Sequence, residues 1–521
     1  MTLNSLQTTL IYFLFSVRAA SSESIYAPVV DLGYAQYQGV FDADLNITSF
    51  LGMRYAAAPT GNLRWRAPSP PSAAGGVQLA SSDPPPCHQG AFGASPTNPM
   101  LVTRAAAETE DCLFLSVYTP ALNSTKPLPT IVWIHGGGYV LGGATGFNGV
   151  QLLQEANNEA VVVIIQHRLG LFGFLAGQQV KDGGALNVGL LDQDFAFRWV
   201  NKNAERALSG NPDHVTIWGQ SAGAGAVIQH VVANNGKTQP QLFKAAITSS
   251  TFLPSQYKYN DRIPQTLFNE VAAQARCTDS DANALECLRA VDSASLETIN
   301  LNILLAGFSQ TFAFGPVVDG SFITQSPTEL LAQGKTNGEI LLSMTNSNEG
   351  PLFINQTVDY TNVAHYVREL FPLFGDTESA AVASVYESLG PPLEQVDLIM
   401  GESIFVCPTY NLLRAFPGAS YKGEYAVTPG MHTNDLFYYF SLIILPGYVP
   451  FNNTDFRTAF NQGFFSFAAH LDPNDKLVPS ITPAWPKWSA AQVEMVFNKT
   501  EDDVPMIAAA PTSQALLDRC E

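Results

Sequence analysis

Short runs of apolar and β-branched residues recur along the chain, and small or polar residues follow each of them at once. Three such runs are 130–134, 215–218 and 340–344. Continuous apolar runs of this length are typical of strands buried within a sheet. The pattern therefore predicts three buried strands, and it directs attention to the turns that follow them.

The turn after 215–218 places Ser221 between Gly219 and Gly223, ahead of a stretch of small residues that can begin a helix. A serine held at the end of a strand needs a very tight turn into the next helix. Only residues with almost no side chain two positions before and after it let the backbones pass. This pattern is typical of a nucleophile elbow, although a small-residue turn without chemistry gives the same letters.

The run 130–134 is followed by His135 and then by Gly136, Gly137 and Gly138. Three glycines leave their backbone N–H groups unshielded, so these groups can point at an oxygen that becomes negatively charged. A flexible glycine turn is the alternative. Two strand-to-glycine junctions of this kind in one chain favour acyl-transfer chemistry.

Several longer motifs occur in order along the chain, among them FLGMRYAAAPTGNLRW, EDCLFLSVYTP, VWIHGGGYVLGG, NVGLLDQDFAFRWV, VTIWGQSAGA, FGPVVDG and TNSNEG. In these motifs the chain resembles the type-B carboxylesterase/lipase family, which includes cholinesterases and fungal lipases. The resemblance begins near Phe50 and continues past His432. It implies an α/β class protein with the α/β-hydrolase fold, a large, mostly parallel central sheet flanked by helices.

Composition fits a large, well-packed enzyme. The chain has 521 residues, 46% of them hydrophobic, and a formal net charge of −19. The motifs are interleaved from end to end, so we expect residues 20–521 to form a single type-B carboxylesterase catalytic domain. The negative charge and the lack of a basic stripe argue against a nucleic-acid partner. The apolar run 436–445 is too short to span a membrane.

The amino terminus predicts secretion. An apolar run at 10–17 precedes Val17-Arg18-Ala19, which has small residues at the positions that signal peptidase reads. We expect a signal peptide at 1–19, with an uncleaved anchor as the alternative, and an extracellular mature protein. Sequons, which also arise by chance, mark five candidate glycosylation sites: Asn46, Asn123, Asn355, Asn452 and Asn498.

Six cysteines in a secreted chain predict disulfides. Fifteen pairings are possible, and spacing alone does not choose among them. The family resemblance implies two local loops and a third, long-range bridge like the extra bridge of cholinesterases. The implied pairs are Cys87 with Cys112, Cys277 with Cys287, and Cys407 with Cys520.

A serine hydroxyl needs a base and a third group that orients that base. The loop around His432 resembles the family's catalytic-histidine loop, and Glu349 follows 340–344 where the family carries its triad carboxylate. Asp319 is the competing acid, but it resembles a structural aspartate. The other histidines, such as His135, His167 and His470, are expected to be structural or solvated.

The resemblance implies a two-step acyl transfer on Ser221 with the triad Ser221, Glu349 and His432. The backbone N–H groups of Gly137, Gly138 and Ala222 would hold the oxyanion. No cofactor is implied, and no histidine or cysteine spacing resembles a metal site.

The expected substrate is a small-molecule ester, soluble and of short to medium chain or aromatic, because the loop between Cys87 and Cys112 is short and contains the helix breakers of 90–96. Gln220 stands where many relatives carry glutamate, and 87–112 contains no tryptophan. Both departures argue against choline esters. A lipase for long-chain acylglycerols and a non-catalytic adhesion-type member are the alternatives.

Overall fold

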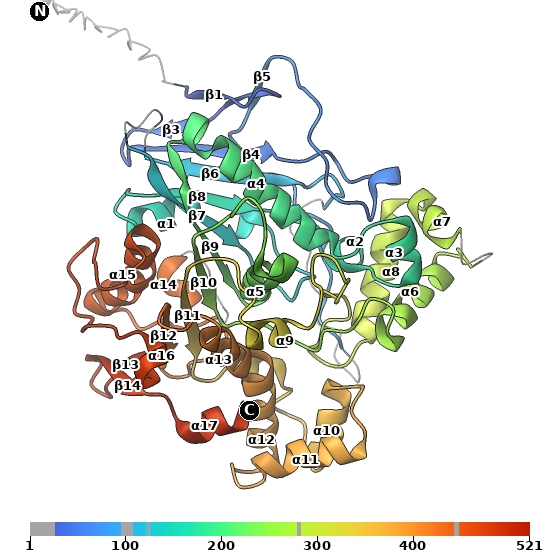
Figure 1. Cartoon of the computed structure of the whole chain (residues 1–521), viewed down its shortest axis with the longest axis vertical. Helices are drawn as coiled ribbons and strands as arrows, with labels where there is room; N and C mark the ends of the chain where they lie inside the picture. Colours follow the sequence, from blue (N-terminus) through green and yellow to red (C-terminus); the bar gives the residue numbers. More distant parts are fainter. Residues whose placement is uncertain (1–26, 95–107, 121, 123–125, 279–282, 442–447) are drawn as a thin grey trace, which may run out of the picture.

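The structure is a computed structural model, and it describes residues 27–94, 108–120, 122, 126–278, 283–441 and 448–521. The predicted signal peptide at 1–19 and the sequon at Asn123 lie outside these residues. Within them, the chain winds around one large sheet, with helices on both of its faces (Figure 1).

The large sheet contains eleven strands among the described residues. Six neighbouring pairs at its centre are parallel, and the pairs toward the two edges are antiparallel. A smaller sheet is formed by β1 (Val29–Asp31), β2 (Gln36–Gln38) and β5 (Val77–Leu79). In spatial order the strands of the large sheet are β14 (Pro505–Pro511), β13 (Val493–Lys499), β12 (Ser420–Tyr425), β11 (Ile340–Asn346), β10 (Ala245–Ser249), β9 (Gly210–Gln220), β7 (Leu128–Ile134), β8 (Val161–Ile165), β6 (Phe114–Thr119), β4 (Ile47–Arg54) and β3 (Val40–Asp42).

The three predicted strands lie within β7, β9 and β11, and burial on both faces explains their apolar runs. Along β7, Val132 and Ile134 pack into one core, while Ile131 and Trp133 pack into the core on the opposite face. Successive side chains of a strand point to opposite faces, so a strand covered on both sides needs apolar residues at every position.

Helices pack on both faces of the large sheet and complete a hydrophobic core on each face. On one face α4 (Val188–Leu208), α5 (Ala222–Gly236) and α13 (Cys407–Arg414) pack against the sheet, and α1 (Gly149–Glu155), α14 (Leu436–Tyr439) and α15 (Thr454–His470) contribute to the core on the other face. Within the described part of the chain, no helix is long and apolar enough to cross a membrane. The other α-helices are α2 (Gly170–Phe174), α3 (Gln178–Gly183), α6 (Arg262–Gln274), α7 (Ala284–Ala290), α8 (Ser293–Ala306), α9 (Pro327–Ala332), α10 (Val363–Leu370), α11 (Asp376–Tyr386), α12 (Pro392–Gly401), α16 (Trp488–Ala491) and α17 (Gln514–Arg519).

The structure contains the three disulfides that the family resemblance implies: Cys87–Cys112, Cys277–Cys287 and Cys407–Cys520. The first two close short loops. The third ties the start of α13 to the end of α17, where the chain terminates (Figure 1). It therefore fixes the carboxyl-terminal segment to a helix that packs on the central sheet.

Several histidines are buried within the cores and away from solvent. Burial lowers the pKa of His135 to about 4 and that of His230 to about 3, from an ordinary value of 6.5. Burial also lowers the pKa of His167, whose ring lies beside that of His135. These side chains are neutral in the folded protein at neutral pH.

We predict that folding stability falls as the pH decreases below about 6.5. The unfolded chain then binds protons that the buried imidazoles do not, so stability present above that pH is lost toward pH 3 to 4. Each such histidine contributes a slope of up to about 1.4 kcal/mol per pH unit. His230→Gln should flatten the dependence measured by urea unfolding between pH 6 and 4, because glutamine can still donate to the Gln193 Oε1 that His230 contacts at 2.9 Å.

His470→Gln is the matched control, since the His470 side chain is one-third exposed and lies at the end of α15. This variant should keep the slope of the wild-type protein. An unchanged slope in the His230→Gln variant would contradict the assignment of acid sensitivity to the buried imidazoles.

Candidate active site

Ser221 occupies the sharp turn between the end of β9 and the start of α5. Its backbone angles are φ 57° and ψ −125°, and its N–H donates to the Ser249 carbonyl at 2.9 Å. A Cβ on Gly219 would overlap the backbone of Gly223, and a Cβ on Gly223 would overlap the carbonyl of Ile134. The two glycines of the sequence motif are therefore required by close backbone contacts.

The structure brings together the three residues that the sequence analysis assigned to a triad. The His432 Nε2 lies 2.9 Å from the Ser221 Oγ, and the His432 Nδ1 lies 2.5 Å from the Glu349 Oε2. All three side chains are buried. The histidine can therefore accept a proton from the serine while its other ring nitrogen donates to the carboxylate.

Two polar residues that the sequence analysis missed hold Glu349. Its Oε1 accepts hydrogen bonds from the Ser250 Oγ at 2.8 Å and from the Asn346 N–H at 2.7 Å. The Asn346 side chain donates to both Ser250 and the Asp435 Oδ1, each at 3.0 Å. The sequence positions of both residues could have pointed to the site, because Ser250 directly follows the buried strand β10 and Asn346 is the last residue of β11.

Asp319, the competing acid, serves a different purpose. Its carboxylate accepts from the Asn187 side chain at 2.6 Å and from the backbone N–H groups of Ser321 and Phe322. These bonds organise a turn, and they use both carboxylate oxygens.

The His470 Nδ1 contacts the Asp475 carbonyl at the surface.

The glycine loop after β7 lies directly against the turn at Ser221. A Cβ on Gly136 would come within 3.1 Å of the Ser221 Cβ. Gly137 and Gly138 have φ values of 111° and 61°, in the region that favours glycine. Ala222 is the first residue of α5, so its N–H has no acceptor inside the helix. The loop and the helix N-terminus thus lie on either side of Ser221.

The immediate surroundings of His432 are neutral and aromatic. The Phe405 ring lies 4.5 Å from the imidazole and the Phe353 ring 5.0 Å from it, measured between ring centroids. The Gln220 Nε2 lies 3.4 Å from the His432 Nε2. Gln220 therefore contributes an uncharged amide beside the contact between His432 and Ser221.

A cavity of about 380 Å³ opens beside this site, and aromatic residues form much of its lining. Phe353 and Phe405 belong both to its wall and to the surroundings of His432. Phe312, another lining residue, packs against Gly138 of the glycine loop. The cavity therefore shares wall residues with the surroundings of His432 and of the glycine loop, and its aromatic lining is suited to the apolar part of a small molecule.

The start of the loop between Cys87 and Cys112 packs against the rim of this cavity. The Gly93 N–H donates to the Thr311 carbonyl at 2.9 Å, and the Phe92 ring lies 5.2 Å from the Phe312 ring. Residues 95–107 of the loop lie outside the described part of the chain. The predicted helix breakers up to Ala94 thus form a docked segment and not a free-standing one.

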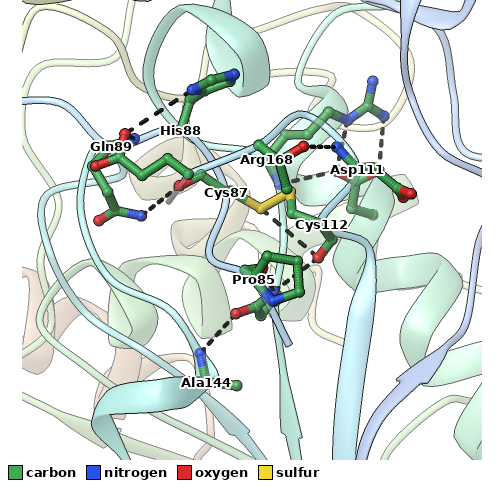
Figure 2. Close-up of a disulfide and its surroundings, with 12 residues drawn as sticks. Pro85, Cys87, His88, Gln89, Asp111, Cys112, Ala144 and Arg168 are labelled. Carbon is green, nitrogen blue, oxygen red and sulfur yellow. Dashed lines mark hydrogen bonds and ion pairs between the residues drawn. A yellow bond between two sulfur atoms is a disulfide. The ribbon is translucent and has the colours of Figure 1, made fainter. Parts of the chain in front are cut away.

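A second cluster lies next to the Cys87–Cys112 disulfide, around His88 (Figure 2). The His88 Nδ1 is 3.3 Å from the Glu297 Oε2 and 4.0 Å from the Glu108 Oε2. One imidazole and two carboxylates form a donor set that a divalent cation such as Zn²⁺ can use. Spacing in the sequence did not indicate this group, because Glu297 lies in α8, far along the chain from the disulfide loop that carries His88 and Glu108.

Comparison with known proteins identifies the family. Residues 27–511 match the model of the carboxylesterase family. The chain is 29% identical over 456 residues to a secreted lipase of Arthroderma benhamiae, an alignment that covers 84% of this chain and 85% of that protein. It is 31% identical over 420 residues to liver carboxylesterase 1 of Mus musculus, covering 75% and 73% of the two chains.

Two solved structures have the same fold as this chain. The crystal structure of Aspergillus niger EstA superposes with a TM-score of 0.83 at 28% identity, covering 95% of this chain and 97% of that one. The structure named PNB esterase gives a TM-score of 0.77 at 23% identity, covering 95% and 100%, and shows the fold alone. The expected α/β-hydrolase fold is thereby confirmed. The chain belongs to the carboxylesterase family and is a carboxylic ester hydrolase.

Proposed function

We propose that this protein is a secreted serine esterase that hydrolyses soluble esters through an acyl-enzyme on Ser221. The observation that carries the proposal is the buried chain of contacts from Ser221 through His432 to Glu349, at 2.9 and 2.5 Å. A nucleophile, a base and an orienting carboxylate in this order are what serine-based acyl transfer requires.

In the first step His432 takes the proton of Ser221 at Nε2 as the Oγ attacks the ester carbonyl. The N–H groups of Gly137, Gly138 and Ala222 stabilise the oxyanion that forms. The tetrahedral intermediate then collapses, the bond to the alcohol oxygen breaks, and His432 returns its proton to the leaving alcohol. Glu349 remains ionised and stabilises the imidazolium.

In the second step a water molecule replaces the alcohol. His432 removes a proton from this water, its oxygen attacks the acyl carbon, and the same N–H groups hold the second oxyanion. Collapse breaks the bond to the Ser221 Oγ, which recovers its proton from His432 and releases the carboxylic acid. His432 carries out every proton transfer in the cycle.

The substrate class we propose is a short- to medium-chain or aromatic ester. Aromatic walls and a volume of about 380 Å³ favour an apolar group of modest size. The uncharged Gln220 beside His432 offers no partner to a cationic substrate. Gly93 is hydrogen-bonded to the cavity rim. This contact supports an entrance through which substrate reaches the cavity without an oil surface having to open it.

Secretion and glycosylation belong to the same proposal. Three disulfides fit an oxidising compartment, and one relative is itself a secreted lipase. We propose that 1–19 is removed and that 20–521 acts as one catalytic domain. Asn46, Asn355 and Asn452 are exposed, whereas Asn498 is half-buried. The exposed sequons are the better acceptors for a glycan.

Replacing the nucleophile tests the mechanism. Ser221→Ala should lower kcat by about 10⁶ while leaving thermal unfolding close to that of the wild-type protein, because a triad nucleophile and its base act as a unit. A fluorophosphonate should label the wild-type protein at Ser221, as read by peptide mass spectrometry, and should not label the variant. Substantial residual hydrolysis by the variant would rule out Ser221 as the nucleophile.

Replacing histidines tests the base. His432→Gln should reduce ester hydrolysis by several orders of magnitude, because glutamine cannot accept the serine proton. His470→Gln should retain full activity, since that ring contacts the Asp475 carbonyl at the surface. Steady-state kinetics with a chromogenic acetate or butyrate measures both. The opposite pattern would place the base elsewhere.

A partly soluble triester tests whether substrate enters the cavity directly from solution. The rate of hydrolysis is measured as a function of the triester concentration. We expect smooth saturation below the solubility limit, because the site takes dissolved substrate. A sharp rise in rate where droplets form would instead assign the protein to the interfacially activated lipases. A panel of chromogenic esters of increasing acyl length should show highest kcat/KM for short and medium chains.

A further inference from the structure

A histidine and two glutamates meet beside the Cys87–Cys112 disulfide. His88 and Glu108 lie near the two ends of the loop that this disulfide closes, and Glu297 lies on α8. Figure 2 shows His88 directly next to the disulfide. The three residues bring one imidazole nitrogen and two carboxylate oxygens within 4.8 Å of one another. Donor atoms this close together can bind one metal ion.

The distances between these atoms suit a tetrahedral zinc ion. In such a site the ion lies about 2.0–2.1 Å from an imidazole nitrogen and about 2.0–2.2 Å from a carboxylate oxygen, so that two ligand atoms are about 3.4 Å apart. The His88 Nδ1 is 3.3 Å from the Glu297 Oε2, which matches this separation, and 4.0 Å from the Glu108 Oε2. A small rotation of the Glu108 side chain completes three corners of the tetrahedron, and a water molecule can occupy the fourth.

Backbone contacts hold the two ends of the disulfide loop together. Cys87 and Thr109 form a parallel β-bridge next to the disulfide. The Gln89 N–H donates to the Glu108 Oε2 at 3.1 Å. Carboxylates that bind metals commonly accept a hydrogen bond of this kind, which orients them. The structure of the loop therefore fixes His88 and Glu108 on one side of the cluster.

The helix α8 places Glu297 on the other side. Asn300 lies three residues further along α8, on the same face of the helix, and its Nδ2 donates to the Gln89 carbonyl at 3.3 Å. The His88 ring stacks on Phe172, with 4.7 Å between the ring centroids and 24° between the ring planes. Because the helix face and the imidazole are both fixed, the cluster is largely organised before an ion binds.

Burial and charge favour a divalent cation at this cluster. The side chains of His88, Glu108 and Glu297 have only 6%, 7% and 11% of their surface exposed. Buried charges in proteins are paired or coordinate metals. A divalent cation balances the charge of two carboxylates and takes the imidazole as a neutral ligand. Ca²⁺ prefers six to eight oxygen ligands, whereas an imidazole together with carboxylates suits Zn²⁺.

From this geometry we infer that His88, Glu108 and Glu297 form a binding site for one Zn²⁺ ion, which joins the disulfide loop to α8. The end of α8 leads into residues 307, 308 and 310–312, which line the cavity beside the active site. Residues 93 and 94 of the same loop bond to the carbonyls of 311 and 305. The ion therefore stabilises the packing of the loop on the cavity rim. This role is separate from the chemistry at Ser221.

Zinc binding is measured on the whole protein, purified without a polyhistidine tag and treated with EDTA. Isothermal titration with zinc chloride should give a stoichiometry of one ion per chain. At a free zinc concentration of 100 times Kd, the Tm should rise by about 2–3 °C, because an ion that binds only the folded state stabilises it.

The variants are Glu297→Gln and His88→Gln, each of which removes one ligand. Either should weaken zinc binding by more than about 100-fold, since loss of a group that only orients a ligand already costs about 10–100-fold. His470→Gln is the matched control and should keep the wild-type Kd. The His470 Nδ1 lies 3.5 Å from the Asp475 Oδ2, so this pair resembles His88 and Glu297 but lies at the surface.

X-ray absorption at the zinc edge of the wild-type protein identifies the ligands without any substitution, so it tests the site even where a variant does not fold. We expect one imidazole and otherwise oxygen ligands at about 2.0–2.2 Å. Absence of zinc binding to the wild-type protein, binding that both ligand variants retain, or a spectrum with two or more imidazoles would each overturn the inference. A protein that binds zinc here but hydrolyses no ester would contradict the proposed function alone.

Discussion

Close backbone packing around one serine determines how the rest of this site is built. Ser221 has a positive φ, and its turn brings β9, α5 and the end of β7 so near one another that a Cβ on Gly219 or Gly223 would overlap backbone atoms. Because the strand and the helix are both held by the cores on the sheet, the turn cannot relax. Strain at Ser221 is therefore sustained by packing elsewhere, and the hydroxyl stays fixed 2.9 Å from the His432 Nε2.

The parallel pairing of β9, β10 and β11 places the residues that form hydrogen bonds with Glu349. Gln220 pairs with Ser249 on β10, and Ser249 pairs with Met344 on β11. The carboxyl ends of three neighbouring strands therefore meet at one edge, where ligands bind in sheets of this kind. That edge presents Ser221, Ser250 and Asn346 in sequence order across the sheet, so the hydrogen bonds to Glu349 follow directly from strand order.

Local patterns in the sequence could predict the strands and the tight turn at Ser221, because each depends on neighbours a few positions away. The apolar runs within β7, β9 and β11 and the glycines around Ser221 are of this kind. The placement of Glu349 and His432 needed the family resemblance as well. The group around His88 could not be predicted, since one of its members, Glu297, comes from a distant segment of the chain. The loop at 90–94 packs on the cavity rim because its backbone bonds to 305–311, a contact that composition does not indicate.

Charge within the site follows from burial and from a few hydrogen bonds. Glu349 accepts hydrogen bonds from Ser250 and Asn346, and its other oxygen lies 2.5 Å from the His432 Nδ1. Burial raises the pKa of nearby Asp435, and the charge on Glu349 acts in the same direction. On the other side of the ring the uncharged Gln220 amide lies 3.4 Å from the His432 Nε2, so this neighbour adds no charge next to the imidazole.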